Sequence, residues 1–421
     1  MQLYKHQAEA LESTKDLTHV AYYHDMGLGK TFTGAEKLVR LGANVNLVIC
    51  QKSKVEDWVE HFEKYYPDVE VFDLTDKKQF TYFMINCSGD CSNDIGVINY
   101  ELAFRRPELL NLRDFTLMLD ESSMIQNDTA KRTKFILKLK PKNVILLSGT
   151  PTGGKYEKLY SQLKLLGWNI SKHLYWKQYI EVRMLDLVGR SIPIVTGYKN
   201  VERLKEKMAE HGCRFLKTED VFDLPTQQFI PVNIKMTNDY KRFRKYRVLI
   251  DETYNIELVG DTTLKRMLYE RQLCGQYNKY KLEAFKDILE STDDRLIVFY
   301  NFTEEWDRMG EICDALNRPS GIVNGQFKHL GAYEEHDNSV TFIQYQAGAM
   351  GLNLQKANKI IYFTPPLSSE LYEQSKKRIH RIGQSKPCFY YNLIVKGSIE
   401  EKIYETLAMR KDYTERLFEN D

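Results

Sequence analysis

Seven residues near the start of the chain, 25–31 (DMGLGKT), have the composition of a phosphate-binding turn. Their glycines let the backbone approach an anion closely, and a helix beginning at Lys30 would point its free N–H groups at that anion. Lys30 would reach the β- and γ-phosphates of a nucleotide, and the Thr31 hydroxyl would ligate Mg²⁺. The usual motif has a further glycine where this chain has His24, but the Gly-x-Gly-Lys-Thr core is intact. We therefore predict an ATP site built from Met26, Gly27, Leu28, Gly29, Lys30 and Thr31.

Two acids, Asp120 and Glu121, follow the apolar run 117–119. A buried acid costs free energy unless a cation or hydrogen bonds compensate it, so this placement needs a reason. Taken alone, such a pair would be interpreted as a surface turn. Downstream of a phosphate loop, Asp120 is suited to hold Mg²⁺ and Glu121 to position or deprotonate water. We predict that both residues are catalytic.

Two further segments follow the same logic. Residues 148–152 (SGTPT) come after another apolar run, and their hydroxyls could sense the γ-phosphate or simply form a strand-to-helix turn. Far downstream, Arg378 and Arg381 lie in the basic segment 374–384. Residues three apart share a helix face, so both guanidinium groups could point at one anion as arginine fingers. The alternative is a solvated, basic helix end.

Composition sets the outer limits. The chain has 421 residues, enough for two or more domains, and its 43% hydrophobic and 28% charged residues are typical of a folded globular protein. The net charge is +2, so any binding of nucleic acid would depend on local basic patches. No apolar run approaches the ~20 residues that cross a bilayer, and the first residues lack the order of a signal peptide. Seven scattered cysteines indicate reduced thiols, and we expect a cytoplasmic protein with no membrane partner.

The elements that must position these residues alternate between apolar runs and polar stretches of helical spacing, which predicts parallel α/β domains. The segment from about 155 to 291 has few strand signals, and Pro225 and Pro231 punctuate it. We place the boundary at Pro225, which gives an N-terminal ATP-binding lobe over 1–224 and a second lobe over 225–421, with a helical insertion at about 232–290. Strands are predicted at 46–50, 95–98, 115–119, 144–147, 295–299, 340–343, 359–363 and 389–395.

In their order along the chain, these motifs resemble the Swi/Snf-type ATPases of helicase superfamily two, which move along double-stranded DNA. The most specific matches are residues 25–31 and residues 380–384 (HRIGQ). The resemblance runs from Leu3 to about Arg410 and has the size of a minimal motor. Its other matches are 3–7, 47–62 with Trp58, 99–100, 127–134, 298–303, 347–354 and 397–403.

The resemblance implies two tandem RecA-like domains with mainly parallel sheets, ATP and Mg²⁺ in the cleft between them, and a C-terminal brace helix over about 398–421. It assigns Gln7 to the adenine base and Gly351 to close approach by ATP. It implies a monomer that grips double-stranded DNA by its phosphates, without sequence preference, in a bacterial or phage-infected cytosol. The residues that it assigns to DNA are Lys52, Ser53, Asn99, Tyr100, Asn127, Lys131, Asn301, Gln346, Ala347 and Gly348.

Two other functions stay open. A strand-separating helicase of phage-type replication or recombination would carry the same motor motifs. A non-catalytic nucleic-acid-binding scaffold is disfavoured by the intact Lys30, Glu121 and paired arginines. One departure from the family bears on mechanism: the acid pair is followed by Ser122 and Ser123, and Ser123 stands where the family usually has histidine. The resemblance implies that this position takes part in coupling hydrolysis to lobe movement.

Overall fold

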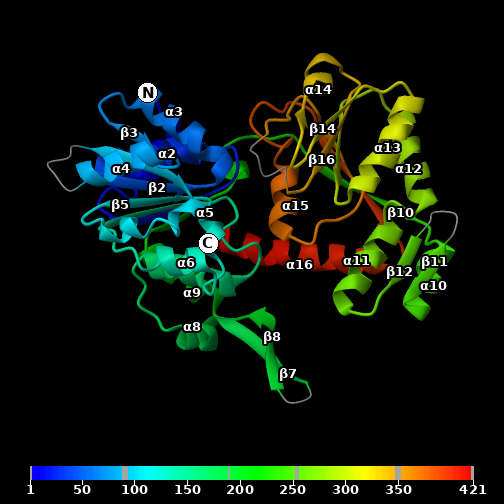
Figure 1. The fold of residues 1–421 in the computed structure, drawn as a ribbon, viewed down its shortest axis with the longest axis horizontal. Coiled ribbons are helices and arrows are strands. Elements are labelled where there is room, and N and C mark those ends of the chain that lie inside the picture. Colours follow the sequence, from blue (N-terminus) through cyan, green and yellow to red (C-terminus); the bar gives the residue numbers. More distant parts are fainter. Residues whose placement is uncertain (1, 88–92, 188–189, 252–255, 347–351, 419–421) are drawn as a thin grey trace. The chain divides into compact units, whose positions relative to one another are not determined.

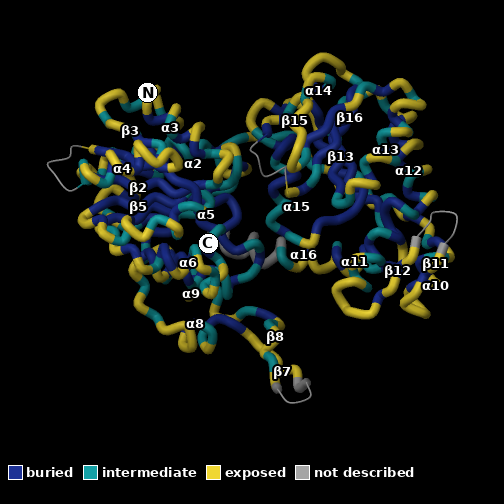
Figure 2. The backbone as a smooth tube through the Cα atoms, in the orientation of Figure 1, coloured by how far each residue is buried: buried dark blue, intermediate teal, exposed yellow. Residues whose placement is uncertain are grey.

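The computed structural model describes residues 2–87, 93–187, 190–251, 256–346 and 352–418. The chain divides into two compact units, Met1–Val221 together with Asp412–Asp421, and Phe222–Lys411. Each unit is built around its own seven-stranded sheet (Figure 1). Figure 2 shows that the strands of both sheets are the most deeply buried parts of the chain.

The sheet of the first unit is parallel throughout, in the order β3-β4-β2-β5-β6-β1-β9. Apolar side chains of its strands are buried on both faces, as expected when helices cover a parallel sheet on two sides. Its strands are β1 (His19–His24), β2 (Val45–Cys50), β3 (Val71–Asp73), β4 (Asp94–Asn99), β5 (Thr116–Asp120), β6 (Asn143–Leu147) and β9 (Cys213–Leu216).

Helices α2 (Lys30–Leu41) and α3 (Val55–Tyr65) cover one face of this sheet through Leu38, Trp58 and Phe62. Helix α1 (Lys5–Glu12) packs on this side through Ala10, and aromatic and aliphatic residues from the helices within residues 77–210 cover the opposite face. A two-stranded hairpin, β7 (Ile180–Leu187) and β8 (Arg190–Tyr198), extends from this unit (Figure 1). The remaining helices are α4 (Lys77–Asn86), α5 (Tyr100–Ala103), α6 (Lys131–Ile136), α7 (Tyr160–Leu165), α8 (Lys172–Tyr179) and α9 (Val201–Glu210).

The sheet of the second unit has the order β10-β18-β17-β13-β16-β14-β15, and within its described residues every pair of neighbouring strands is parallel except β14–β15. β10 pairs with β18 along its whole length, so this unit begins with an edge strand that belongs to its own sheet. Its strands are β10 (Gln227–Ile234), β13 (Leu296–Tyr300), β14 (Ser320–Val323), β15 (Lys328–His329), β16 (Val340–Gln344), β17 (Lys359–Tyr362) and β18 (Cys388–Val395).

Helices cover both faces of the second sheet as well, one group through Phe243, Phe285 and Met309 and the other through Tyr333 and Tyr372. A short hairpin, β11 (Val248–Asp251) and β12 (Ile256–Val259), joins the first two helices of the unit. The helices are α10 (Asn238–Tyr246), α11 (Thr263–Cys274), α12 (Lys279–Glu290), α13 (Thr303–Ala315), α14 (Gly331–Glu335), α15 (Ser369–Lys376) and α16 (Ile399–Phe418).

The predicted fold class is confirmed: two tandem RecA-like domains, each a mainly parallel sheet flanked by helices. All of the strands predicted from apolar runs are present, within one residue of their expected positions. The expectation of few strands between 155 and 291 is wrong, because β7 to β12 lie there, and the predicted insertion contains a hairpin as well as helices. These strands are short, exposed or at a sheet edge, so they lack a continuous apolar run. In the described part of the chain, no helix is long and apolar enough to cross a membrane.

Candidate active site

Three polar strand ends meet at one edge of the first sheet. β6 lies between β1, which ends at His24, and β5, which ends at Asp120. Because the three strands are parallel, the turns that follow them lie at the same carboxyl edge. The topology therefore brings together the phosphate loop, the acid pair and the turn that begins at Ser148.

The phosphate loop has the backbone that its glycines were expected to supply. Gly27 and Gly29 have φ values of 87° and 69°, in the left-handed region, and Lys30 is the first residue of α2. The Nζ atom of Lys30 donates to the carbonyls of His24 (2.8 Å) and Asp25 (3.0 Å). A Cβ on Gly149 would lie 3.4 Å from this Nζ, so the turn after β6 packs directly against the loop lysine.

Helix α1 holds the loop from the other side. Gln7 is 2% exposed, and its amide Nε2 donates to the carbonyl of Gly29 at 3.1 Å, while a ring nitrogen of His6 lies 2.9 Å from the carbonyl of Leu28. A Cβ on Gly29 would lie 2.4 Å from Gln7 Nε2, so alanine there would displace the glutamine. Gln7 thus positions the phosphate loop in this structure, and its contact with adenine stays a prediction.

His24 stands where the usual phosphate-loop motif has a glycine, and its imidazole adds no charge beside Lys30. Its ring is 1% exposed. Burial, together with the nearby charges of Lys30 and His6, lowers the pKa of His24 to about 3. The imidazole is therefore neutral at neutral pH, and the positive charge next to the phosphate loop comes from Lys30.

Asp120 is oriented by an indole. Trp58, which is 2% exposed, donates from Nε1 to Asp120 Oδ2 at 2.9 Å. Burial raises the pKa of Asp120, and the Trp58 hydrogen bond and the charge of Lys30 oppose that rise. In the sequence Trp58 is only one residue of a motif, and no local pattern links it to an acid 62 residues away.

Glu121 is held in an unusual backbone conformation. Its φ of 57° lies in the left-handed region, where a non-glycine residue is strained. Its carboxylate Oε1 accepts hydrogen bonds from the hydroxyls of Ser148 (2.6 Å) and Ser123 (2.7 Å). Burial raises the pKa of Glu121, and these two hydrogen bonds oppose the rise. Ser123, at the position where the family usually has histidine, thus contacts Glu121 directly.

The side chain of Tyr100 contacts the turn that carries the two acids. Its side chain is fully buried, and its hydroxyl donates to the backbone carbonyls of Asp120 (3.0 Å) and Glu121 (3.3 Å). The ring is buried and serves these internal hydrogen bonds, so the contact of Tyr100 with DNA stays a prediction. The tyrosine holds the strained turn that carries the two acids.

The donor set at this edge fits ATP with Mg²⁺. The half-buried Thr31 hydroxyl at the N-terminus of α2 and the carboxylate of Asp120 are the hard oxygen ligands that Mg²⁺ prefers. A Cβ on Gly149 would meet Met26 Cγ at 3.3 Å and Lys30 Nζ at 3.4 Å, so a side chain there would crowd the loop lysine. When bound there, Mg²⁺ would neutralise charge on the phosphates.

The other DNA-binding candidates of the first unit differ in exposure. Lys52, Ser53, Asn127 and Lys131 are exposed at the starts of helices or in turns. Asn99 is 6% exposed and donates to Glu101 Oε2 at 3.1 Å. Lys52 and Asn99 line one cleft of about 730 Å³, into which several carboxylates also project. A phosphate inside that cleft would meet negative charge, so the exposed side chains of Lys52 and Ser53 are better placed for a phosphate than Asn99 is. These carboxylates belong to Glu56, Glu60, Asp73 and Glu101.

The two candidate arginines do not share a helix face. Helix α15 ends at Lys376, so Arg378 and Arg381 both lie in the turns that follow it. Arg378 is 7% exposed, and Arg381 donates from Nη1 to the side chain of Asn353. Burial lowers the pKa of Arg381. The premise of the arginine-finger prediction was therefore wrong in its geometry, since the basic segment was expected to stay helical.

Two residues near these arginines, His380 and Gln384, fix the turns. A ring nitrogen of His380 lies 2.9 Å from the carbonyl of Pro225, and Gln384 Nε2 donates to the carbonyl of Ala357 at 2.8 Å. Gln346 is exposed just after β16. Three further candidates, Ala347, Gly348 and Gly351, lie outside the described residues.

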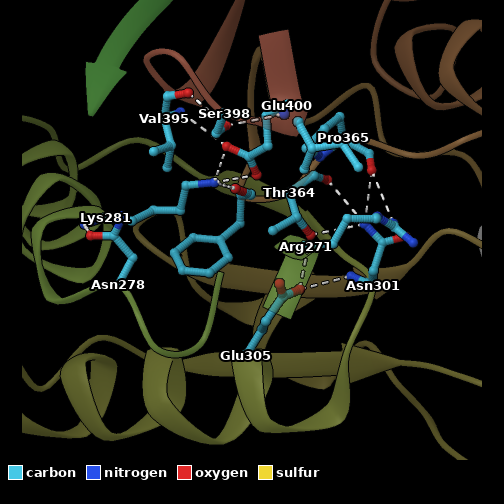
Figure 3. Close-up of polar contacts among 12 residues, drawn as sticks. Arg271, Asn278, Lys281, Asn301, Glu305, Thr364, Pro365, Val395, Ser398 and Glu400 are labelled. Carbon is cyan, nitrogen blue, oxygen red and sulfur yellow. Dashed lines mark hydrogen bonds and ion pairs between the residues drawn. The ribbon is translucent and has the colours of Figure 1, made fainter. Parts of the chain in front are cut away.

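Asn301, a further DNA-binding candidate, is committed to a buried network (Figure 3). Its amide Nδ2 donates to Thr364 Oγ1 (2.8 Å) and to the carbonyl of Pro365 (3.1 Å), to which Arg271 also donates. Glu305 Oε2 accepts from the backbone N–H of Asn301 (2.9 Å) and from Thr364 Oγ1 (2.9 Å). The network holds the segment between β17 and α15, which leads to the two arginines.

A buried ion pair completes this network (Figure 3). Lys281 Nζ, fully buried, lies 2.7 Å from Glu400 Oε1 and donates to the carbonyl of Phe363 at 2.8 Å. Glu400 Oε2 also accepts from the backbone N–H of Val395 at 3.0 Å. The pair therefore joins α12 and the first turn of α16 to the ends of two central strands, and removing either partner would leave a buried charge uncompensated.

Glu305 makes the second unit sensitive to pH. Burial raises the pKa of Glu305 to about 7 from 4.5, although hydrogen bonds to Oε2 and the charge of Lys281 favour the carboxylate. A raised pKa means that the folded state holds the proton more tightly, so the free energy of unfolding falls as pH rises from about 4.5 through 7. This group alone accounts for up to about 3 kcal/mol of that fall.

We expect Glu305→Gln to remove this dependence. The variant should exceed the wild type in unfolding free energy at pH 8, by up to about 3 kcal/mol, and the gap should close towards pH 5. Urea unfolding of both proteins across this pH range measures it. A gap that is constant with pH would show that Glu305 does not titrate there.

The fold and this edge define the chain as a two-domain nucleotide-binding protein of the RecA-like class. Residues 20–279 match the family model of the SNF2-related domain, and residues 280–383 match the helicase conserved C-terminal domain. The chain therefore belongs to the SNF2-related family, which confirms the resemblance found in the sequence.

The chain has low sequence identity to the following relatives, and it covers only part of the length of the two curated ones. The chain is 22% identical to the Chromodomain-helicase-DNA-binding protein 1-like of Mus musculus, over 94% of this chain and 47% of that protein. It is 23% identical to the DNA repair and recombination protein RAD54-like of Drosophila willistoni, over 94% of this chain and 60% of that protein. A Sulfolobus solfataricus SWI2/SNF2 ATPase core in complex with dsDNA is 19% identical with a TM-score of 0.46, covering 99% of this chain and 92% of that one. The chain thus spans about half the length of the curated relatives it matches.

Proposed function

We propose that this protein is a DNA-stimulated ATPase that translocates on double-stranded DNA and remodels DNA or displaces bound proteins. The observation that carries the proposal is the meeting of Lys30, Asp120 and Glu121 at one sheet edge, each held by buried partners. A non-catalytic scaffold would have no use for a strained, doubly hydrogen-bonded glutamate beside a phosphate loop.

The proposed division of labour follows from the contacts. Lys30 leaves its two carbonyl partners for the β- and γ-phosphates of ATP, while Thr31 and Asp120 hold Mg²⁺. Glu121 positions the attacking water and accepts its proton, with Ser123 and Ser148 fixing the carboxylate. The left-handed glycines let the loop backbone donate to the phosphates.

We propose that the protein translocates on duplex DNA and binds its phosphates. The residues proposed for these contacts include Lys52, Ser53, Asn127 and Lys131. Support comes from family membership and from the exposure of these side chains on one unit. Asn301 and Asn99 are less suited to this role than the exposed lysines, because their amides already serve internal hydrogen bonds.

The test is an ATPase assay without DNA, with single strands and with duplex. We expect duplex to give the largest stimulation, with little dependence on base sequence. The duplex affinity should fall steeply with salt, because each neutralised phosphate adds about 0.9 to the slope of log K against log salt. Equal activity with and without DNA would contradict the proposal. If the protein separates the strands of a labelled duplex but does not translocate along a duplex that stays paired, a strand-separating helicase is favoured instead.

A further inference from the structure

Outside the candidate active site, a basic pocket lies where three helices of the second unit meet. Residues of α10, α11 and the start of α16 line a pocket of about 320 Å³. Each helix contributes one cation to the lining: Arg244 from α10, Arg266 from α11 and Lys402 from α16. Three cations that come from separate helices and face one pocket indicate a site for an anion.

The one acidic side chain that lines this pocket in the described part of the chain already accepts hydrogen bonds from neighbouring side chains. Among the described residues that line it, Glu270 is the one carboxylate. Glu270 is 6% exposed, and it accepts from Arg266 Nε at 2.8 Å and from the hydroxyl of Tyr240 at 3.3 Å. Three cations and one buried acid leave an excess of two positive charges, carried at the open side of the pocket by Arg244 and Lys402.

The positive charge continues along α10 beyond the pocket. Tyr240 and Phe243 face the core, so the basic residues of this helix point outward, and all of them are exposed. Lys241 and Lys245 lie one turn apart, next to Arg244, and the one acid of the helix, Asp239, is within 3.9 Å of Arg242. A single small anion would fill the pocket and leave this strip unused. The cations from α10 to its C-cap are Lys241, Arg242, Arg244, Lys245 and Arg247.

We propose that this pocket and the exposed strip of α10, together the α10 patch, bind the phosphate backbone of duplex DNA as a contact separate from the motor motifs. The proposal rests on the proposed function. A phosphate sits between Arg244, Arg266 and Lys402, and the neighbouring phosphates of the same backbone meet Lys241 and Lys245. Such contacts add affinity and salt dependence without reading sequence.

The test variant combines Lys241→Ala, Lys245→Ala and Lys402→Ala. It leaves Arg244 and Arg266 in place, because Arg244 donates to the carbonyl of Gly397 at 2.8 Å and Arg266 pairs with Glu270. The matched control, Lys279→Ala with Lys286→Ala and Lys356→Ala, removes the same charge from other exposed positions of the unit. Thermal unfolding of both variants establishes that they fold.

We expect the test variant to bind duplex about ten- to a hundredfold more weakly than the control at 0.1 M salt, with the salt slope reduced by about 2 to 3. Fluorescence anisotropy with a labelled duplex at several salt concentrations measures both. Equal duplex affinity and equal salt slope in the two variants would overturn the proposal. It would also be overturned if the test variant bound inorganic phosphate more weakly than the control but bound duplex equally well. The proposed function fails separately, if duplex does not stimulate the wild-type ATPase.

Discussion

Replacing Glu121 by glutamine is expected to lower ATP turnover about 10²- to 10⁴-fold while ATP affinity stays near the wild-type value. Glutamine keeps an oxygen at the position of Oε1, so the hydroxyls of Ser148 and Ser123 can still donate to it. It cannot take a proton from water. The substitution therefore removes the base and leaves the local hydrogen bonds, which separates chemistry from binding.

The measurement pairs steady-state phosphate release, at saturating duplex, with the dissociation constant of a fluorescent ATP analogue. Glu108→Gln is a suitable control, because Glu108 is an exposed carboxylate of the same unit. We expect this control to retain full activity. Turnover near the wild-type rate in the Glu121 variant would remove Glu121 from the mechanism.

The parts of this site that the sequence could predict are those set by spacing along the chain. A glycine turn that leads into Lys30, and an acid pair after an apolar strand, each follow from local rules. That these segments share one edge follows from parallel strand order, which makes their carboxyl ends adjacent. The same rules located the central strands of both sheets, since each is a continuous apolar run.

The parts that could not be predicted depend on contacts between distant residues. The indole of Trp58 reaches Asp120, and Tyr100 reaches the carbonyls on either side of the strained turn. Nothing in a motif distinguishes a tyrosine that faces DNA from one that supports a catalytic turn. Ser123 was noticed only as a departure from the family, yet it donates to the carboxylate that it follows.

The position at which a helix ends is the other feature that the sequence did not predict. The basic segment around Arg378 has the composition of a helix, but α15 ends at Lys376, where the backbone enters turns. Those turns are fixed by His380 and Gln384, which reach the carbonyls of Pro225 and Ala357. Tertiary hydrogen bonds of this kind override helix propensity, so periodicity alone could not place the two guanidinium groups.

The last prediction concerns these arginines, which belong to the second unit while Lys30, Asp120 and Glu121 belong to the first. We propose that Arg378 and Arg381 stabilise the charge that develops on the γ-phosphate during hydrolysis. Alanine at either position should then lower the DNA-stimulated turnover about 10³- to 10⁵-fold, the range of an arginine-finger loss. ATP affinity should change much less, because Lys30, Thr31 and the phosphate loop remain.

Lysine variants provide the matched control. Arg381→Lys keeps the charge but not the planar fork of donors, so we expect it to recover little of the activity lost in Arg381→Ala. Arg381 is the cleaner test, since it is half-buried and its guanidinium group donates to the side chain of Asn353. Arg378 is 7% exposed, so thermal unfolding must first establish that its alanine variant folds. If both alanine variants fold, bind duplex and hydrolyse ATP at the wild-type rate, the second unit supplies no group to the reaction, and it would then serve as a DNA-binding domain beside an independent ATPase.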